Sequence, residues 1–348
     1  MKTTHVTMKQ VAAAAGVSQA TVSMCLANHP RIPPETRDRI REIATKLGYQ
    51  PNPYVSALMR VRREGRPPKS APVIALVNSF PHHDAWRRHQ SPTICQIREG
   101  AMERATARGY RGQEFWLNEP GMTGERFSNM LHTRGIQGLL ISPAADGAAP
   151  PQLDWSRFAS VGISVPQPSL NLATVCNDHY FSSLQVVREC HRRGYRRPGL
   201  VMLRGHNERF QGRWTAGYLV ARTFLSDLAS IPPLLIESWK ETARILKWIR
   251  RERIDVLVGA GMENLETLVK GAGLRVPEDI GLAALSVPAP GHAHAGVYQN
   301  GRLIGENAMD LLISMVERNE RGLPLQAVTM MVEGCWNEGR TLRPRPKA

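Results

Sequence analysis

Apolar side chains recur at helical spacing in three short stretches of the first fifty residues. This spacing predicts helices over about 8–15, 19–27 and 34–47, and Thr7 and Gln10 stand in the capping-box arrangement that opens the first helix. The apolar positions of these helices would meet in one small core, formed by Val11, Ala15, Val17, Val22, Leu26, Ile40, Ile43, Ala44 and Leu47.

The connections between these helices carry a second signal. Gly16 permits a sharp turn because glycine adopts a positive φ without strain, and Ser18 stands where a side chain caps the second helix. Pro34 suits the first turn of the third helix, and Gly48 is placed to end it. Two short helices joined by a tight glycine turn, the second with small polar residues on its outer face, predict a helix-turn-helix that enters the DNA major groove.

Two segments lead out of this three-helix region. Asn52-Pro53 is typical of a helix start and predicts a single short helix over 52–60. Residues 61–71 are basic, rich in proline and without an apolar period, which is typical of a linker.

From residue 73 onward, apolar runs alternate with helical stretches. Such alternation is typical of parallel, doubly wound sheets, and about 275 residues are enough for two lobes whose ligands bind at the carboxyl ends of the strands. Strands are predicted over 73–77, 113–116, 138–141, 158–162, 198–203, 234–237, 256–259 and 281–285. Helices are predicted over 93–108, 124–132, 181–193, 213–228, 241–252, 264–272 and 302–318.

Positive charge is concentrated at the start of the chain. The 348 residues carry 45 Lys and Arg against 30 Asp and Glu, a formal net charge of +15. Residues 1–70 hold 12 Lys and Arg against 4 Asp and Glu, whereas the other 278 residues hold 33 against 26. A net charge of +8 in a fifth of the chain favours a polyanionic partner.

Neither the N-terminal residues nor the cysteines indicate export. The first residues lack the apolar stretch of a signal peptide, and no run of about 18 apolar residues occurs. The cysteines are odd in number, widely spaced and without a Cys-x-x-Cys pair, which favours free thiols over a disulfide framework or a zinc site. They are Cys25, Cys95, Cys176, Cys190 and Cys335. We therefore expect a cytoplasmic protein without a membrane anchor.

Residues 6–58 closely resemble the DNA-binding headpiece of the lactose-repressor (LacI) family of transcription regulators. The resemblance is carried at fixed spacing by Thr7, Val11-Ala12, Ala15-Gly16-Val17-Ser18, Thr21-Val22-Ser23, Thr36-Arg37, Gly48-Tyr49 and Pro51-Asn52. The rest of the chain resembles, more loosely and mostly through its alternation, the family's effector domain, a periplasmic-binding-protein-like pair of α/β lobes. This resemblance implies a homodimeric transcriptional regulator, usually a repressor, that binds a near-palindromic DNA operator and is modulated by a small-molecule effector between the lobes.

The resemblance and the patterns together give a domain plan. The chain is expected to comprise an all-α headpiece over 1–51, a hinge helix over 52–60, a linker over 61–71 and an effector-binding and dimerisation domain over 72–348. Within that domain we expect lobe 1 over about 72–175 and 300–325, and lobe 2 over about 176–299 and 326–345.

The resemblance also implies which headpiece residues contact DNA. Gln19, Ala20 and Met24 would face base edges, where glutamine can bond adenine and alanine can touch a thymine methyl. Met24 stands where the family usually has an arginine that reads guanine. A thioether cannot donate a hydrogen bond, so Met24 either makes an apolar contact or touches no base. Phosphate contacts are implied for Thr7, Ser18, Thr21, Ser23 and Thr36, to which Arg31 would add a charged contact.

Residues 52–60 match the family's hinge helix, which folds when two protomers meet on DNA. Asn52 and Leu58 would then act in the minor groove, with Leu58 as the wedge that opens the central base step. The alternative is that Leu58 packs on its own headpiece. Val55 and Ser56 replace the family's usual Ala-Arg, so one contact there is missing.

Several effector positions depart from the family pattern. Ser286 replaces a ligand-bonding aspartate, Trp214 takes the place of an arginine before Gly217, and Ala260-Gly261 replaces Asn-Asp. These departures argue against a typical sugar: the effector is a less polar or anionic molecule, or none binds. The candidate effector residues, each of which alternatively belongs to the core or the surface, are Ser79, Asp178, Arg213, Trp214, Trp239 and Ser286.

Two other classes of protein compete with this interpretation. One is a cytoplasmic α/β enzyme, or a binding protein, with a basic N-terminal extension; the other is a periplasmic binding protein, which the missing signal peptide opposes. No Gly-x-Ser-x-Gly motif, phosphate-binding loop or carboxylate pair appears, so we predict neither catalytic residues nor a cofactor. His82, His83, Asp84 and His89 favour a surface loop over a metal site, because adjacent loop histidines rarely point at one ion.

Overall fold

The computed structural model describes most of the chain as two compact units. The described residues are 8–26, 32–47, 49, 71–143, 150–165 and 170–343. The first unit comprises Met1–Ala71 with Glu317–Glu320, and the second comprises Pro72–Val316 with Arg321–Ala348. In the described part of the chain, no helix is long and apolar enough to cross a membrane.

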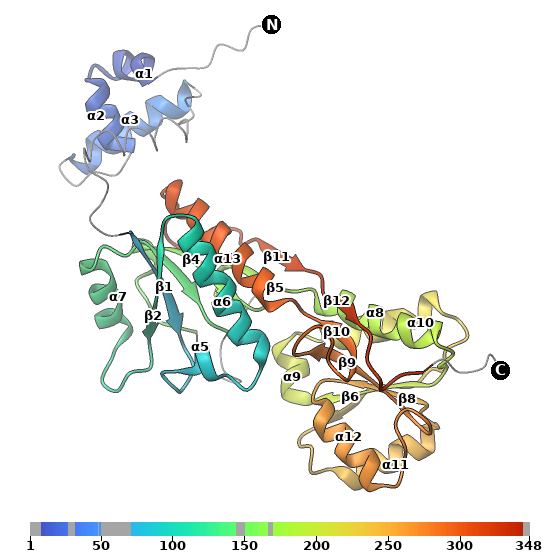
Figure 1. Cartoon of the computed structure of the whole chain (residues 1–348). Coiled ribbons are helices and arrows are strands. Elements are labelled where there is room, and N and C mark those ends of the chain that lie inside the picture. The colour runs from blue at the N-terminus through green and yellow to red at the C-terminus, as the bar shows by residue number, and fades with distance from the viewer. Residues whose placement is uncertain are drawn as a thin grey trace, which may run out of the picture. The chain divides into compact units, whose positions relative to one another are not determined.

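Three short helices form the headpiece and confirm the three predicted from the sequence (Figure 1). They are α1 (Met8–Ala15), α2 (Gln19–Leu26) and α3 (Pro34–Lys46). Their fully buried side chains are Val11, Ala12, Ala15, Val22, Cys25, Ile40 and Ala44. The prediction for Leu47 is wrong: this side chain is 40% exposed, because α3 has 13 residues against 8 in each partner helix and its end extends past the small core.

The turn and the caps of the headpiece follow the local sequence chemistry. Gly16 has a φ of 66°, in the left-handed region that glycine adopts without strain. The Ser18 hydroxyl accepts a hydrogen bond from the backbone N–H of Thr21 at 3.1 Å, as an N-cap residue does. Pro34 occupies the first turn of α3, where its missing N–H costs nothing.

The first lobe of the second unit is built on a six-stranded sheet in which every pair of neighbouring strands is parallel. Its strands are β1 (Val73–Asn78), β2 (Arg111–Trp116), β3 (Gly138–Ile141), β4 (Ala159–Ile163), β5 (Ala173–Asn177) and β11 (Thr329–Val332), in the order β11-β5-β4-β3-β1-β2. Its helical elements are α5 (Ala85–Arg88), α6 (Pro92–Ala107), α7 (Gly124–Thr133), η1 (Trp155–Arg157) and α13 (Gly301–Glu317).

Helices cover both faces of this sheet (Figure 1). Residues of α6 and α13, such as Ile97 and Leu312, form one core with alternate strand positions, and Phe127 and Leu131 of α7 form a second core on the opposite face. Burial on both faces explains why the inner strands β1, β3, β4 and β5 are mostly apolar runs rather than alternating patterns, whereas the edge strands β2 and β11 are partly exposed.

The second lobe repeats this three-layer arrangement. Its strands are β6 (Pro198–Leu203), β7 (Leu234–Ile236), β8 (Val256–Gly259), β9 (Gly281–Val287), β10 (Ala295–Tyr298) and β12 (Cys335–Asn337), in the order β12-β10-β9-β8-β6-β7. Only the β10–β12 pair is antiparallel. Its helices are α8 (His179–Arg192), α9 (Arg204–Arg209), α10 (Arg213–Phe224), α11 (Thr242–Glu252) and α12 (Met262–Gly271). One core contains α8 and α10, and the other contains α11 and α12.

The predicted lobe boundaries need one correction. Residues 326–345 were expected in lobe 2, but β11 at Thr329–Val332 pairs in parallel with β5 and completes the sheet of the first lobe. Only β12 and the residues after it belong to the second lobe. The prediction failed because β11 is a short edge strand whose identity depends on a partner more than 150 residues away.

The chain therefore passes between the lobes three times: after β5, after β10 and after β11. Two of these connections are hydrogen-bonded to each other, because the Val332 carbonyl accepts from the Asn177 side-chain amide at 3.1 Å and from the Asp178 backbone N–H at 2.8 Å. Gln96 of α6 adds a link between the lobes, donating to the Pro288 carbonyl at 2.7 Å.

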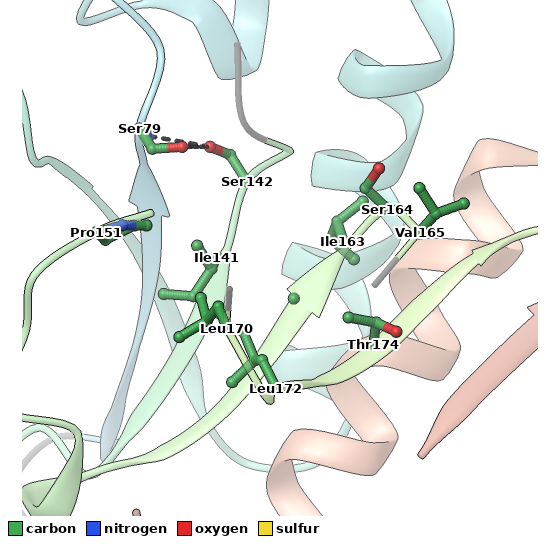
Figure 2. Close-up of a pocket in the computed structure, with 11 residues that line it drawn as sticks. Ser79, Ile141, Ser142, Pro151, Ile163, Ser164, Val165, Leu170, Leu172 and Thr174 are labelled. Carbon is green, nitrogen blue, oxygen red and sulfur yellow. Dashed lines mark hydrogen bonds between the residues drawn. The ribbon is translucent and has the colours of Figure 1, made fainter. Parts of the chain in front are cut away.

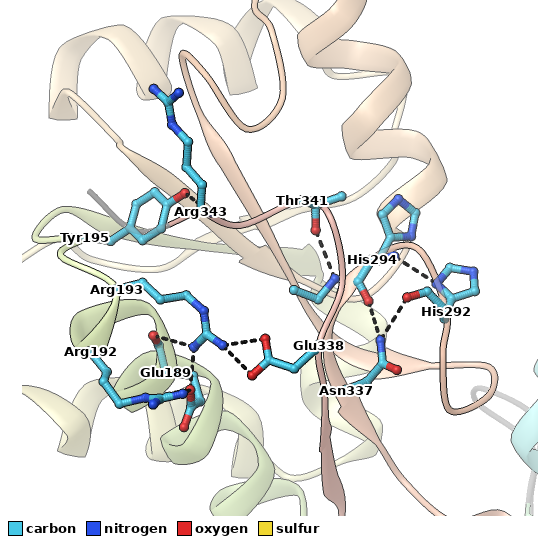
Figure 3. Close-up of polar contacts among 11 residues, drawn as sticks. Glu189, Arg192, Arg193, Tyr195, His292, His294, Asn337, Glu338, Thr341 and Arg343 are labelled. Carbon is cyan, nitrogen blue, oxygen red and sulfur yellow. Dashed lines mark hydrogen bonds and ion pairs between the residues drawn. The ribbon is translucent and has the colours of Figure 1, made fainter. Parts of the chain in front are cut away.

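The end of the chain is fixed into the second lobe by polar contacts (Figure 3). The buried Asn337 amide accepts from the Gly291 N–H at 2.7 Å and donates to the carbonyls of His292 and His294 at 3.0 and 2.8 Å. Beside it, Glu338 pairs with Arg193 at 2.6 Å. These contacts hold β12 against β10 although β12 has only three residues.

Candidate DNA-binding surface and effector pocket

The exposed face of α2 is the surface predicted to read DNA. Val22 and Cys25 point into the core, and at about 100° per residue Ala20 and Met24 lie on the opposite side of the helix, whereas Gln19, its first residue, lies nearer the side of Val22. Gln19 and Ala20 are exposed and Met24 is half-buried. No residue of α2 carries a charge.

The predicted phosphate-contacting residues in the described headpiece lie around this face. Ser18 and Thr21 bond to each other through their hydroxyls at 2.9 Å, and Ser23 lies on the same side of α2 as Ala20. Thr36 is half-buried in the first turn of α3. Short hydroxyl side chains at helix starts are typical groups for fixing a protein on phosphates.

Other predicted DNA contacts lie outside the described residues. These are Thr7, Arg31, Asn52 and Leu58, together with the hinge helix over 52–60 and all but the last residue of the linker over 61–71. Their roles stay predictions from the sequence.

The basic side chains of α3 are partly used for structure. Arg37 donates to the Ile32 carbonyl at 3.0 Å, and Arg39 donates to the carbonyl of Ala15 at the end of α1 at 3.4 Å. The Arg39 contact places a cation at the negative end of the α1 dipole, which stabilises the three-helix packing.

A pocket opens in the first lobe at the carboxyl ends of β1, β3 and β4 (Figure 2). This is where doubly wound folds bind ligands. Its cavity volume of about 40 Å³ is smaller than the roughly 300–1,000 Å³ of typical small-molecule sites. Its lining residues are Ser79, Ile141, Ser142, Pro151, Gly162, Ile163, Ser164, Val165, Leu170, Leu172 and Thr174.

Ser79 is the predicted effector residue that lines this pocket. Its hydroxyl lies 2.7 Å from the Ser142 hydroxyl, and its backbone N–H donates to the same oxygen at 2.9 Å (Figure 2). Ser164, on the other side, has a φ of 127°. A non-glycine residue in that region is strained, and such strain gathers at binding sites more often than elsewhere.

Arg213 and Trp214 belong to an aromatic cluster at the start of α10. Trp214 is buried, and its ring lies 4.6 Å from that of Phe210 and 4.9 Å from that of His179. His179, which the sequence did not single out, stacks on Phe210 at 4.4 Å. Burial, followed by the charge of Arg213, lowers the pKa of His179 to about 3, so this imidazole is neutral.

The other three candidate effector residues lie apart from that cluster or have a structural role. The Asp178 carboxylate caps α8, accepting from the Phe181 N–H at 2.9 Å. Trp239 packs against Gly261, where a Cβ would lie 2.8 Å from the indole and where φ is 86°. Ser286 is the one residue of β9 that is not fully buried.

The histidine-rich loop after β1 is held by its backbone. The buried Asn78 amide donates to the carbonyls of His82 and His83 at 2.8 and 3.0 Å. His89 stacks on Phe80 at 4.9 Å between ring centroids. Among the residues that the structure describes, no group of three or more His, Cys, Asp or Glu side chains is placed to hold a metal ion.

A three-helix unit with an uncharged exposed surface on α2, followed by two α/β lobes of which the first has a pocket at its strand ends, defines a class: a helix-turn-helix protein with a two-lobed α/β body. Comparison with known proteins agrees. Residues 7–52 match the family described as bacterial regulatory proteins, lacI family. The transcriptional regulator CelR of Thermobifida fusca is 26% identical over 328 residues, covering 89% of this chain and 92% of CelR. The transcriptional repressor CytR of Escherichia coli is 25% identical over 207 residues, 57% of this chain and 54% of CytR.

Solved structures show the same fold. The complex of the regulator CelR with cellobiose has a TM-score of 0.59 at 19% identity, covering 97% of this chain and 100% of that one. The lac repressor dimer bound to operator and the anti-inducer ONPF has a TM-score of 0.54 at 17% identity, covering 97% and 99%. The headpiece therefore matches the lacI family over residues 7–52, the chain is similar to CelR along most of its length, and the protein is a DNA-binding transcriptional regulator.

Proposed function

We propose that the protein is a cytoplasmic, homodimeric repressor that binds a near-palindromic operator in double-stranded DNA. The observation that carries this proposal is the uncharged surface of α2 beside a packed core, which includes the exposed Gln19 and Ala20 and the half-buried Met24. Two such surfaces related by a two-fold axis match two half-sites of a palindrome. Relatives support the direction of control and the assembly, since CytR is named a repressor and the lac repressor was solved as a dimer on its operator.

Within this proposal the contacts divide into three groups. Gln19, Ala20 and Met24 read bases, and Asn52 and Leu58 act in the minor groove. Phosphates are held by Thr7, Ser18, Thr21, Ser23, Arg31 and Thr36.

We further propose that a small-molecule effector binds where the strands of the lobes end and changes the affinity for DNA. The pocket beside Ser79 and Ser142 supports this site. CelR was solved with cellobiose and the lac repressor with an anti-inducer, so ligand control is present among proteins of this fold. The effector would change the free energy of operator binding. It can do so only if it binds the DNA-bound and the free states of the protein with different affinities.

Selection of genomic fragments by the full chain tests the DNA part. The retained fragments are sequenced, and their complexes are then examined by mobility shift with two copies of the chain expected per site. A shared near-palindrome with two half-sites is the expected result. Retention without any shared sequence, or one copy per site, would contradict the proposal.

A substitution in the predicted wedge sharpens this test. Leu58→Gly is expected to weaken binding to the selected operator far more than binding to random DNA, because insertion occurs only at the specific central step. Equal losses on both DNAs would contradict a wedge role for Leu58.

A further inference from the structure

The described lining of the first-lobe pocket is uncharged. Its floor is aliphatic, and the remaining side chains that line it offer hydroxyl groups only. The hydroxyls of Ser79 and Ser142 already bond to each other, and the Thr174 hydroxyl lies 3.2 Å from that of Thr329. A polyol brings many donors and acceptors that need partners when buried, and this lining supplies few.

The strand β5, which forms one wall of the pocket, extends toward the positively charged side chain of Arg213. Leu172 just before β5 and Thr174 and Cys176 within it alternate and therefore share one face of the chain, with about 7 Å between Thr174 and Cys176. Met331 of β11 pairs with Cys176, and its sulfur accepts a hydrogen bond from Arg213 at 3.5 Å. The end of β5 therefore lies between the pocket and Arg213, whose positive charge opposes the rise that burial causes in the pKa of the Cys176 thiol.

Arg213 lacks a carboxylate partner in the described part of the chain. The hydrogen bond it makes there goes to the Met331 sulfur at 3.5 Å, a weak acceptor. Asp178, the carboxylate that follows β5, is committed to capping α8. A half-buried guanidinium without a carboxylate partner favours binding of an anion, such as a carboxylate, that can accept two of its N–H hydrogen bonds at once.

The surroundings of Arg213 are aromatic and contain unpartnered buried nitrogens. His179 and Trp214 are each 4% exposed, and His179 Nδ1 and Trp214 Nε1 have no hydrogen-bond partner among the described residues. The positive charge near this cluster extends to the first lobe, because Arg209, after burial, helps to lower the pKa of His89. A ligand here meets cationic and aromatic groups together.

We propose that the effector is a small apolar carboxylate, aromatic or aliphatic, whose carboxylate pairs with Arg213 and whose hydrocarbon part lies against the apolar residues at the mouth of the pocket beyond Thr174. This inference rests on the proposed effector site and names its ligand class. It separates this chain from CelR, which was solved with the neutral sugar cellobiose.

Thermal melting of the full chain with a defined set of ligands tests the proposal. Benzoate, phenylacetate, cinnamate and hexanoate are compared with the neutral benzamide and with cellobiose. At least one carboxylate is expected to raise the melting temperature and to change operator affinity, whereas benzamide and cellobiose do neither. A shift with cellobiose or benzamide alone, or no shift with any of the four carboxylates, would overturn the proposal.

Matched arginine variants locate the site. Arg213→Gln is expected to lower carboxylate affinity about tenfold or more, since it removes a charge-assisted pair, while Arg213→Lys keeps part of the affinity. Arg204→Gln, whose arginine pairs with Glu237 at 2.6 Å, is the control and should leave affinity within about twofold. Equal binding by the Gln variant and the parent chain would refute the role of Arg213.

Operator binding is also measured without ligand on the same preparations. This measurement distinguishes failure of the proposed DNA function from failure of the proposed ligand class. An Arg213→Gln chain that melts cooperatively and still binds operator is folded, so its lost ligand response belongs to the site. If the parent chain binds its operator and no carboxylate alters it, the ligand class is wrong while the DNA function stands.

Discussion

The headpiece and the two-lobed unit resemble their relatives in different ways. Residues 7–52 match the family model directly. Over nearly the whole chain, identity to CelR is only 26%, although the fold of the CelR complex matches with a TM-score of 0.59. In an eight-residue helix such as α2, few positions are free to vary, because Val22 and Cys25 pack the core and most of the others form the predicted binding surface. The lobes bury their cores between sheets and helices, so residues at the strand ends can change without changing the fold.

The largest expected effect comes from charging the headpiece core. Val22 is fully buried on α2, and Val22→Asp puts a carboxylate among the six other buried side chains of the cluster, which a core of this size cannot accommodate. We expect operator affinity, measured by mobility shift, to fall at least about 100-fold while the lobes melt as before. Ala14→Asp adds the same charge at an exposed position of α1 and is the control. A Val22→Asp chain that kept full affinity would show that the two units are not divided as we describe.

Loss of the Asn337 side chain, whose hydrogen bonds hold β12 against β10, should give the next largest effect. Asn337→Ala removes the side chain that satisfies the Gly291 N–H and the carbonyls of His292 and His294. The free energy of unfolding of the lobes, measured with urea, should fall by about 2–4 kcal/mol. The adjacent Glu338→Gln, at a side chain 67% exposed, should cost less than about 1 kcal/mol. A similar loss in the free energy of unfolding for both variants would argue against this role of Asn337.

Acid should weaken the lobes through His179. Its folded pKa is about 3 and its reference value is 6.5, so the unfolded chain binds the proton first as the pH falls. The contribution of the neutral His179 to the free energy of unfolding is complete above pH 6.5 and is lost progressively toward pH 3. At pH 5 the loss is about 2 kcal/mol. His179→Phe should remove this part of the pH dependence in urea unfolding at pH 7 and pH 5. An unchanged slope would place His179 in a solvated setting.

The smallest expected effect distinguishes the predicted base contacts of the headpiece from its predicted phosphate contacts. Gln19→Ala should change preference at one base pair of each half-site, with a loss of roughly tenfold, or about 1.4 kcal/mol, on the selected operator. Thr21→Ala should weaken operator and random DNA alike. Binding measured on a set of single-base operator variants distinguishes the two. A uniform loss for both substitutions would contradict the division of roles.

Much of the fold was predictable because its signals are local. The three headpiece helices and the eight predicted strands are all present, and β3, β6 and β8 have the predicted bounds. The missed strands β5, β10, β11 and β12 have three to five residues, and they contain glycine, asparagine or exposed methionine. Such segments become strands through pairing with distant partners, a signal that local periodicity does not contain. The short helices α5 and α9 were missed for the same lack of a local pattern.

The candidate site was predictable only in part. Ser79 lines the pocket, whereas Trp214 is buried and Asp178 serves as a helix cap, and the effector role of each stays a prediction. His179 was missed because its neighbours Phe210 and Trp214 lie more than 30 residues further along the chain. The departures at Ser286, at Trp214 and at Ala260-Gly261 were the sequence features that argued against a typical sugar.

The three passages of the chain between the lobes have a consequence for the order of synthesis. The described hydrophobic core of the headpiece is formed by residues 8–49, so this core can form early on the ribosome. Both sheets of the lobes wait for their edge strands β11 and β12, which are translated near the end. A nascent chain can therefore have a folded headpiece before either lobe is complete, and the proposed control by ligand can begin only with the last strands.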